Sequence, residues 1–132
     1  MTTLEFYTAL SALWIGLFWA PHILDRAAVR GLSAATDGRG ADTAEQSDWA
    51  RRTVRAHAVA ARSFAAFGPL ALLAMLRIPD DGYPGSLAIA YFLGLVMHYF
   101  VYALGIAVLR TLALLVMTTA ILALALRIAG LI

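Results

Sequence analysis

Residues 84–126 read PGSLAIAYFLGLVMHYFVYALGIAVLRTLALLVMTTAILALAL and decide the fold. They contain two apolar runs without any charged residue, Pro84–Ala103 and Thr111–Leu126. A membrane helix needs about 20 mostly apolar residues, because it rises about 1.5 Å per residue across about 30 Å of hydrocarbon. Each run is therefore predicted to span a membrane. Gly105 is the break between the two runs, which predicts a tight helical hairpin.

Two further stretches are apolar enough to span a membrane: Leu4–Leu24, with Glu5 at its outer end, and His57–Leu76, with Arg62 inside it. Of the 132 residues, 62% are hydrophobic and 14% are charged. Soluble domains are about 45–50% apolar and about 25% charged, so a soluble enzyme with one core is excluded. The sequence predicts an all-α membrane protein, a four-transmembrane-helix bundle that forms a single domain over residues 1–132. The spans are about 4–24, 57–76, 84–103 and 111–126.

The loop over residues 25–55 is the only long polar region, and it carries most of the arginines. Its basic residues are Arg26, Arg30, Arg39, Arg51, Arg52 and Arg55. The opposite face has only Arg77 and Arg127. Because basic loops stay in the cytoplasm, we expect a multi-pass protein with this loop in the cytoplasm and both termini outside it. The formal net charge of +2 gives no reason to expect a nucleic-acid partner, and the absence of cysteine excludes disulfides.

Several polar residues of the spans are expected near the cytoplasmic side. They are Arg26, Arg55, Arg62, His98, Tyr102 and Arg110. A cavity lined by guanidinium groups suits an anionic ligand, because arginine binds carboxylates through two parallel hydrogen bonds. The simpler alternative is that the loop arginines only set topology and that His98 links two helices. Arg62 lies more than one turn inside its span with no carboxylate at that depth, so we expect it to face the protein interior.

Metal binding is not expected, because the three histidines, at positions 22, 57 and 98, lack the spacing of metal ligands. Small residues between Ala56 and Ala66, and at Gly94, allow helices to approach closely and favour assembly with other copies of the chain.

Three segments resemble the MAPEG family, the membrane-associated proteins of eicosanoid and glutathione metabolism, and most of all its short bacterial branch. They are PHILDRAAVRGL (21–32), WARRTVRAHAVAARSFAAFGPLALLA (49–74) and MHYFVYALGIAVLRTLA (97–113). The resemblance implies a homotrimer in a bacterial inner membrane, with glutathione bound between subunits. It implies that Arg110 stabilises the glutathione thiolate, with Tyr102 donating to the same sulfur. It further implies that Arg55, His98 and Arg26 or Arg30 contact the ligand.

The chain departs from the family pattern RAHxNxxE at two positions, where Val59 and Arg62 replace the asparagine and the glutamate. The glutamate would receive the amino group of glutathione. Two like charges 4 Å apart repel by about 4 kcal/mol at an effective dielectric constant of about 20, so Arg62 disfavours glutathione in its usual pose. Two hypotheses follow. One is a glutathione transferase or peroxidase acting on hydrophobic electrophiles; the other is a non-catalytic relative that binds an anionic lipid or amphiphile in the same cleft.

Overall fold

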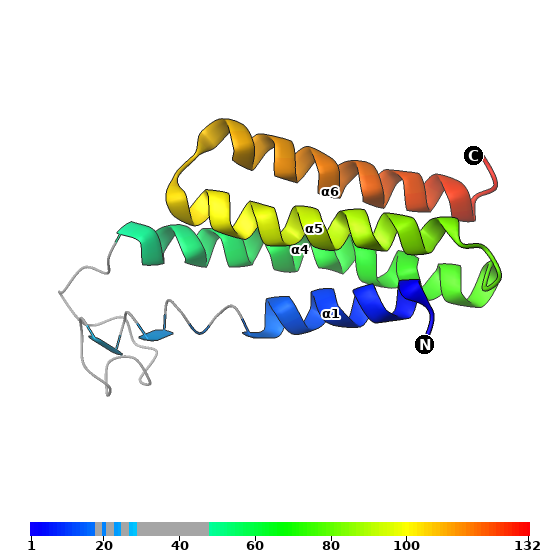
Figure 1. The fold of residues 1–132 in the computed structure, drawn as a ribbon, viewed down its shortest axis with the longest axis horizontal. Coiled ribbons are helices and arrows are strands. Elements are labelled where there is room, and N and C mark those ends of the chain that lie inside the picture. Colours follow the sequence, from blue (N-terminus) through cyan, green and yellow to red (C-terminus); the bar gives the residue numbers. More distant parts are fainter. Residues whose placement is uncertain (18–19, 21–22, 25–26, 29–47) are drawn as a thin grey trace.

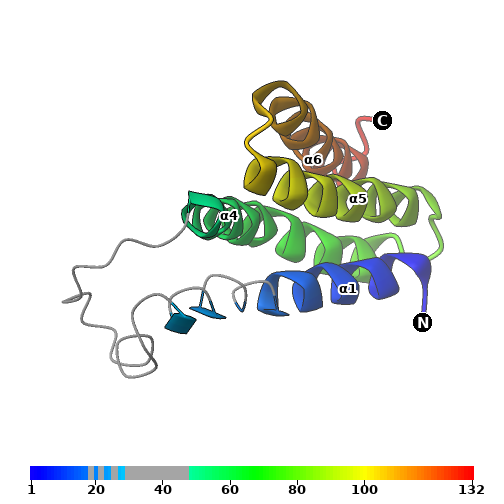
Figure 2. The ribbon, with the colours of Figure 1, turned by 60° about the vertical axis from the view of Figure 1, so that its left-hand side comes forward.

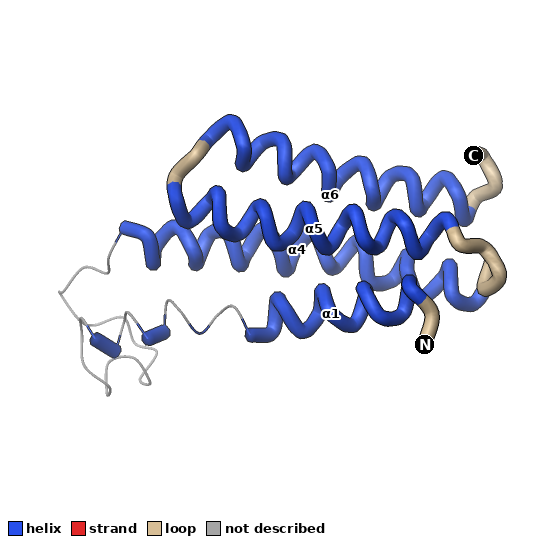
Figure 3. Tube along the Cα trace, viewed as in Figure 1, coloured by secondary structure: helices blue, strands red, loops and turns tan. Residues whose placement is uncertain are grey.

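The computed structural model describes residues 1–17, 20, 23–24, 27–28 and 48–132. Its long helices are α1 (Thr3–Leu17), α4 (Asp48–Arg77), α5 (Tyr83–Leu104) and α6 (Ala107–Ile128). The described residues form helices joined by turns, with no strand among them (Figure 3). The structure therefore confirms the predicted all-α class. The predicted span 4–24 runs past the end of α1 into residues that are only partly described.

The four helices lie side by side, with α1 and α6 on opposite sides of the α4–α5 pair (Figures 1 and 2). α5 packs against each of the other three helices. Both termini and the turn between α4 and α5 lie at one end of the bundle, here called the Gly82 end. The start of α4 and the turn between α5 and α6 lie at the other, the Gly105 end. This up-and-down arrangement brings the first turns of α4 and α6 together with the last turns of α5.

The interior between α4, α5 and α6 is filled by aromatic rings and small side chains. The rings of Phe67 and Tyr91 stack in parallel with their centroids 4.1 Å apart, and both residues are fully buried. Tyr91 meets the Ser63 hydroxyl at 2.7 Å, while Ser63 donates to the carbonyl of Ala60. Gly94 lets α6 approach α5, since a Cβ there would lie 2.9 Å from Met117 Cγ. Gly94 therefore serves packing inside one chain, where the sequence had suggested contact between copies.

The hairpin of α5 and α6 depends on Gly105, which ends α5 in the left-handed region with φ of 77°. The Gly105 N–H donates to Tyr102 O at 3.1 Å, and the Ile106 N–H donates to Val101 O at 3.0 Å. These two bonds form a Schellman cap, which uses glycine because an L-residue is strained at such a φ. The chain thus reverses within two residues, and α6 begins at Ala107.

Two hydrogen bonds between α4 and α5 fix how the helices are aligned and therefore the depth of Arg62. Arg52 reaches the carbonyl of Ala103, and Ser63 meets the hydroxyl of Tyr91. Arg62 follows Arg52 by ten residues, so it lies about 15 Å farther along the bundle axis. The 22 residues of α5 extend about 33 Å, close to the thickness of the hydrocarbon layer. Arg62 is consequently near the middle of the membrane-spanning part.

Candidate functional site

Three polar side chains meet at the Gly105 end of the bundle. His98 and Tyr102 lie one turn apart on α5, and their rings contact each other edge-on with centroids 5.4 Å apart. Arg110 extends from the first turn of α6, and its Cζ lies 4.9 Å from the centroid of the Tyr102 ring. That contact is a cation–π interaction. The sharp reversal at Gly105 makes it possible, because it returns the chain alongside the last turn of α5.

Burial distinguishes the members of this His98–Tyr102–Arg110 cluster. His98 is only 1% exposed, whereas Tyr102 and Arg110 are half-buried. The Nδ1 atom of His98 is buried without a hydrogen-bond partner among the residues that the structure describes. A buried polar atom left unpaired costs about 1–3 kcal/mol, and native proteins rarely retain one without a reason. The cluster thus combines a cation and a phenol at its edge with a ring nitrogen that has unused hydrogen-bonding capacity.

Arg55 and Arg62 lie elsewhere, on the outer face of α4, and both are exposed in the single chain. The structure does not bring them into one cavity with His98, which is inside the bundle. The interior that Arg62 was expected to face is therefore not that of its own chain. The described ion pairs use other arginines, joining Asp48 to Arg51 and Asp81 to Arg127. Arg62 is also deeper than His98, so these residues do not share one level of the membrane.

The predicted ligand contact Arg26, and Arg30 as its alternative, lie outside the described residues. Among the residues that are described, no group of three histidine, cysteine or carboxylate side chains could hold a metal ion.

Two contacts made by α4 were not anticipated from the sequence. His57, the histidine of the RAH segment, places its Nε2 2.9 Å from the carbonyl oxygen of Ile15 and so ties α4 to α1. Arg52, interpreted as a topology determinant, donates from Nε to the carbonyl of Ala103 at 2.9 Å. The one signal for His57 was its position on the helix, since it points about 140° away from Arg62. Nothing in the sequence marks Arg52 among its neighbouring arginines.

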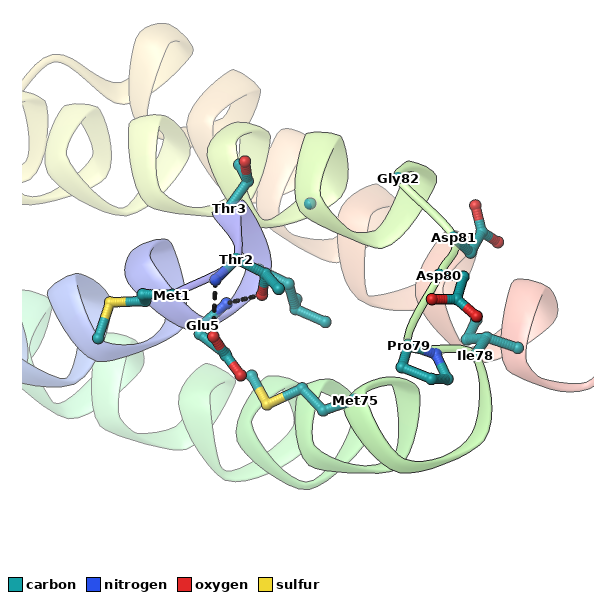
Figure 4. A pocket seen from close by; sticks show the side chains of 12 residues that line it. Met1, Thr2, Thr3, Glu5, Met75, Ile78, Pro79, Asp80, Asp81 and Gly82 are labelled. Atoms are coloured by element: carbon teal, nitrogen blue, oxygen red, sulfur yellow. Dashed lines mark hydrogen bonds between the residues drawn. The ribbon is translucent and has the colours of Figure 1, made fainter.

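A cavity of about 410 Å³ opens at the Gly82 end, far from the cluster, between the start of α1 and the turn after α4 (Figure 4). Two of the carboxylates that line it, Glu5 and Asp81, have structural roles. Glu5 accepts from the Thr2 N–H at 2.6 Å and Thr2 caps Glu5 in return, which is a capping box for α1. The Arg127 guanidinium and the backbone N–H of Tyr83 hold the pKa of Asp81 below its usual range. This cavity therefore belongs to the ends of the helices, and the candidate site remains the cluster.

The class of protein follows from these observations. Three of the described helical segments are long and apolar enough to cross a membrane. They are Arg51–Arg77 of α4 and the whole of α5 and α6. The chain is an integral membrane protein built as a helical bundle. It belongs to the MAPEG family, whose sequence profile matches residues 4–130. Neither the curated proteins nor the solved structures yield a match to the chain.

Proposed function

We propose that this chain is a glutathione-dependent enzyme, a transferase or peroxidase that acts on hydrophobic electrophiles dissolved in the bilayer. One observation carries the proposal: the Arg110 guanidinium lies over the Tyr102 ring beside the buried, unpaired Nδ1 of His98. Membership of the MAPEG family supports a place in glutathione or eicosanoid metabolism. The three side chains fit the thiol end of glutathione, because they offer a fixed cation and hydrogen-bonding groups at a water-poor position.

Each residue of the cluster has a defined part in this proposal. Glutathione supplies a nucleophilic sulfur, which must be ionised to react. Arg110 provides a positive charge that favours the thiolate over the thiol, and it keeps that charge at every physiological pH. Tyr102 donates a hydrogen bond from its hydroxyl to the same anion. His98 offers the ligand its Nδ1, which has no partner among the described residues; because this histidine is 1% exposed, the half-buried Tyr102 ring must move aside for that contact.

A second function is favoured by Arg62, which stands where the family pattern has a glutamate. The ligand would then lack an ammonium group, and the chain would be a non-catalytic relative that binds an anionic lipid or amphiphile. Arg55 and Arg62 are both exposed on one face of α4, two turns apart, and no described carboxylate neutralises them. A charged side chain near the middle of a bilayer costs about 2.5–3.5 kcal/mol on insertion scales, so this face needs a covering partner.

The proposal includes the assembly and the orientation of the protein. A homotrimer, with α4 near the threefold axis, would cover the Arg55–Arg62 face and place the ligand between neighbouring copies. The Gly105 end would face the cytoplasm of a bacterial cell and both termini would lie outside it, as the arginine asymmetry indicates. The remaining surface of the spans would contact lipid.

Native mass spectrometry after detergent extraction tests the ligand directly. With glutathione added in excess, we expect a weakly bound glutathione adduct on the unmodified protein and on Arg77→Gln, a control in which an exposed arginine at the other end of α4 is neutralised. Arg110→Gln should lose the thiolate absorbance of bound glutathione, because the stabilising charge is gone. A lipid mass in place of glutathione would support the second function. An unmodified protein that carries glutathione without any thiolate absorbance, at a pH where free glutathione is a thiol, would contradict the catalytic role of Arg110.

A further inference from the structure

The last turn of α5 has carbonyl groups that its own cap does not satisfy. The final carbonyls of a helix have no partner within the helix. The Schellman cap at Gly105 occupies Val101 O and Tyr102 O. The next carbonyl, that of Ala103, accepts instead from the Nε of Arg52 at 2.9 Å, across 51 residues of sequence. Arg52 thus completes the cap of α5 from another helix.

Arg52 is well placed to hold this turn. It lies in the second turn of α4 and is half-buried, so its hydrogen bond is partly shielded from water. Its Nε and Cζ atoms also lie 3.8 and 3.9 Å from the point that a Cβ on Gly105 would occupy. A cation at the carboxyl end of a helix is favoured by the helix dipole. One side chain therefore contacts both the last turn of α5 and the glycine at which the chain reverses.

We propose that Arg52 is a positioning residue that fixes Arg110 over Tyr102 by anchoring the turn between them. Tyr102 directly precedes Ala103, whose carbonyl Arg52 binds. Arg110 donates its backbone N–H to Ile106 O at 3.1 Å, so the first turn of α6 starts from the same anchored segment. If the turn moves, the two partners of the cation–π contact move independently. The effect of Arg52 on glutathione binding rests on the proposed function. Its effect on the position of Arg110 relative to Tyr102 does not.

Two substitutions separate the hydrogen bond from the charge of Arg52. Arg52→Gln removes the charge but places an amide nitrogen as far along the side chain as the arginine Nε. Arg52→Met has similar length and no donor. Arg51→Met is the matched control, because Arg51 is exposed and pairs with Asp48 within α4.

The first measurement needs no ligand. In protein labelled with ¹³C-histidine, the ring signal of His98 is assigned by its loss in His98→Gln. This signal reports the Tyr102 ring that packs against it. We expect it to move in Arg52→Met and to keep its native position in Arg52→Gln and in Arg51→Met. The second measurement is the affinity for glutathione, which should fall about tenfold in Arg52→Met alone, as loss of a partly buried hydrogen bond predicts.

The outcomes distinguish this inference from the proposed function. An unchanged His98 signal in Arg52→Met overturns the positioning role, whatever happens to glutathione. A displaced His98 signal in Arg52→Gln overturns the hydrogen-bond account, and it does so even if Arg52→Met fails to fold. A displaced signal in Arg52→Met alone, with no glutathione bound by the unmodified protein, supports the positioning role and counts against glutathione as the ligand.

Discussion

Reversing the charge at position 62 tests directly which ligand the chain binds. Arg55, Val59 and Arg62 lie on one side of α4, at intervals of four and three residues. The double substitution Val59→Asn with Arg62→Glu restores the family pattern on this exposed face. We expect the unmodified protein to bind glutathione weakly, and the double variant to bind it at least tenfold more tightly.

The magnitude follows from the distance between the guanidinium and the ammonium group of the ligand. At an effective dielectric constant of about 20, like unit charges repel by about 4 kcal/mol at 4 Å and by about 1.4 kcal/mol at 12 Å. A difference of about 1.4 kcal/mol is a tenfold change in dissociation constant. Removing the repulsion therefore gives at least a tenfold gain whenever the ammonium group binds within about 12 Å of position 62, and the attraction to glutamate adds to it.

Calorimetry with two ligands isolates the repulsion between Arg62 and the ammonium group of the ligand. The ligands are glutathione and N-acetylglutathione, which lacks the ammonium charge but keeps the thiol and both carboxylates. The unmodified protein should prefer N-acetylglutathione, and the double variant should prefer glutathione. If the unmodified protein binds glutathione tightly and the double variant weakens it, Arg62 is a working ligand contact. The charge argument is then refuted.

Three further predictions test other parts of the chain. Cysteines placed singly at Ser33 and Ser86 should label from opposite faces of sealed vesicles, and labelling from the same face would contradict the four-span arrangement. Because the pKa of Asp81 is lowered in the folded chain, its stabilising contribution is present above about pH 4 and is lost as the pH falls through the folded pKa. Asp81→Asn should therefore flatten the acid side of a melting-temperature profile, and an unchanged profile would exclude this linkage. Gly105→Ala should destabilise the bundle by about 1–2 kcal/mol, because an L-residue is strained at its φ of 77°. Gly82→Ala, at φ of −77° with open space around it, is the control and should melt like the unmodified protein.

The hairpin could be predicted from sequence because local chemistry determines it. Gly105 is the only break between two uncharged apolar runs, and the structure places the left-handed cap at this residue. The helices α4, α5 and α6 extend beyond their predicted spans, whereas α1 ends before its predicted span does. α4, for example, begins at Asp48, nine residues before the predicted span at His57. Hydropathy marks only the part of a helix that is apolar, whereas hydrogen bonding continues into the polar turns beyond it.

The cluster could be predicted only in part. His98 and Tyr102 share a helix face, and one short turn separates them from Arg110, so their proximity followed from periodicity and topology. The position of Arg62 did not follow, because the face of a helix that packs inward depends on its neighbours. The buried positions of α4 include those of Ala60 and Phe67, and Arg62 lies on the opposite side.

The His98–Tyr102–Arg110 cluster and the Arg55–Arg62 face differ in which parts of the protein surround them. The His98–Tyr102–Arg110 cluster is assembled by α5 and α6 of one chain, and we propose that Arg52 of α4 fixes its geometry through the Ala103 carbonyl. The Arg55–Arg62 face is left exposed by the same fold, at a depth where lipid is a poor neighbour for a guanidinium. A ligand that bridges the two sets would have its thiol end fixed by one chain and its opposite end selected by a face that a second copy covers in the proposed trimer. Specificity at position 62 is therefore expected to depend on assembly, whereas the proposed thiolate stabilisation at Arg110 is expected to depend on a single chain, through the α5–α6 hairpin and the Arg52 contact from α4.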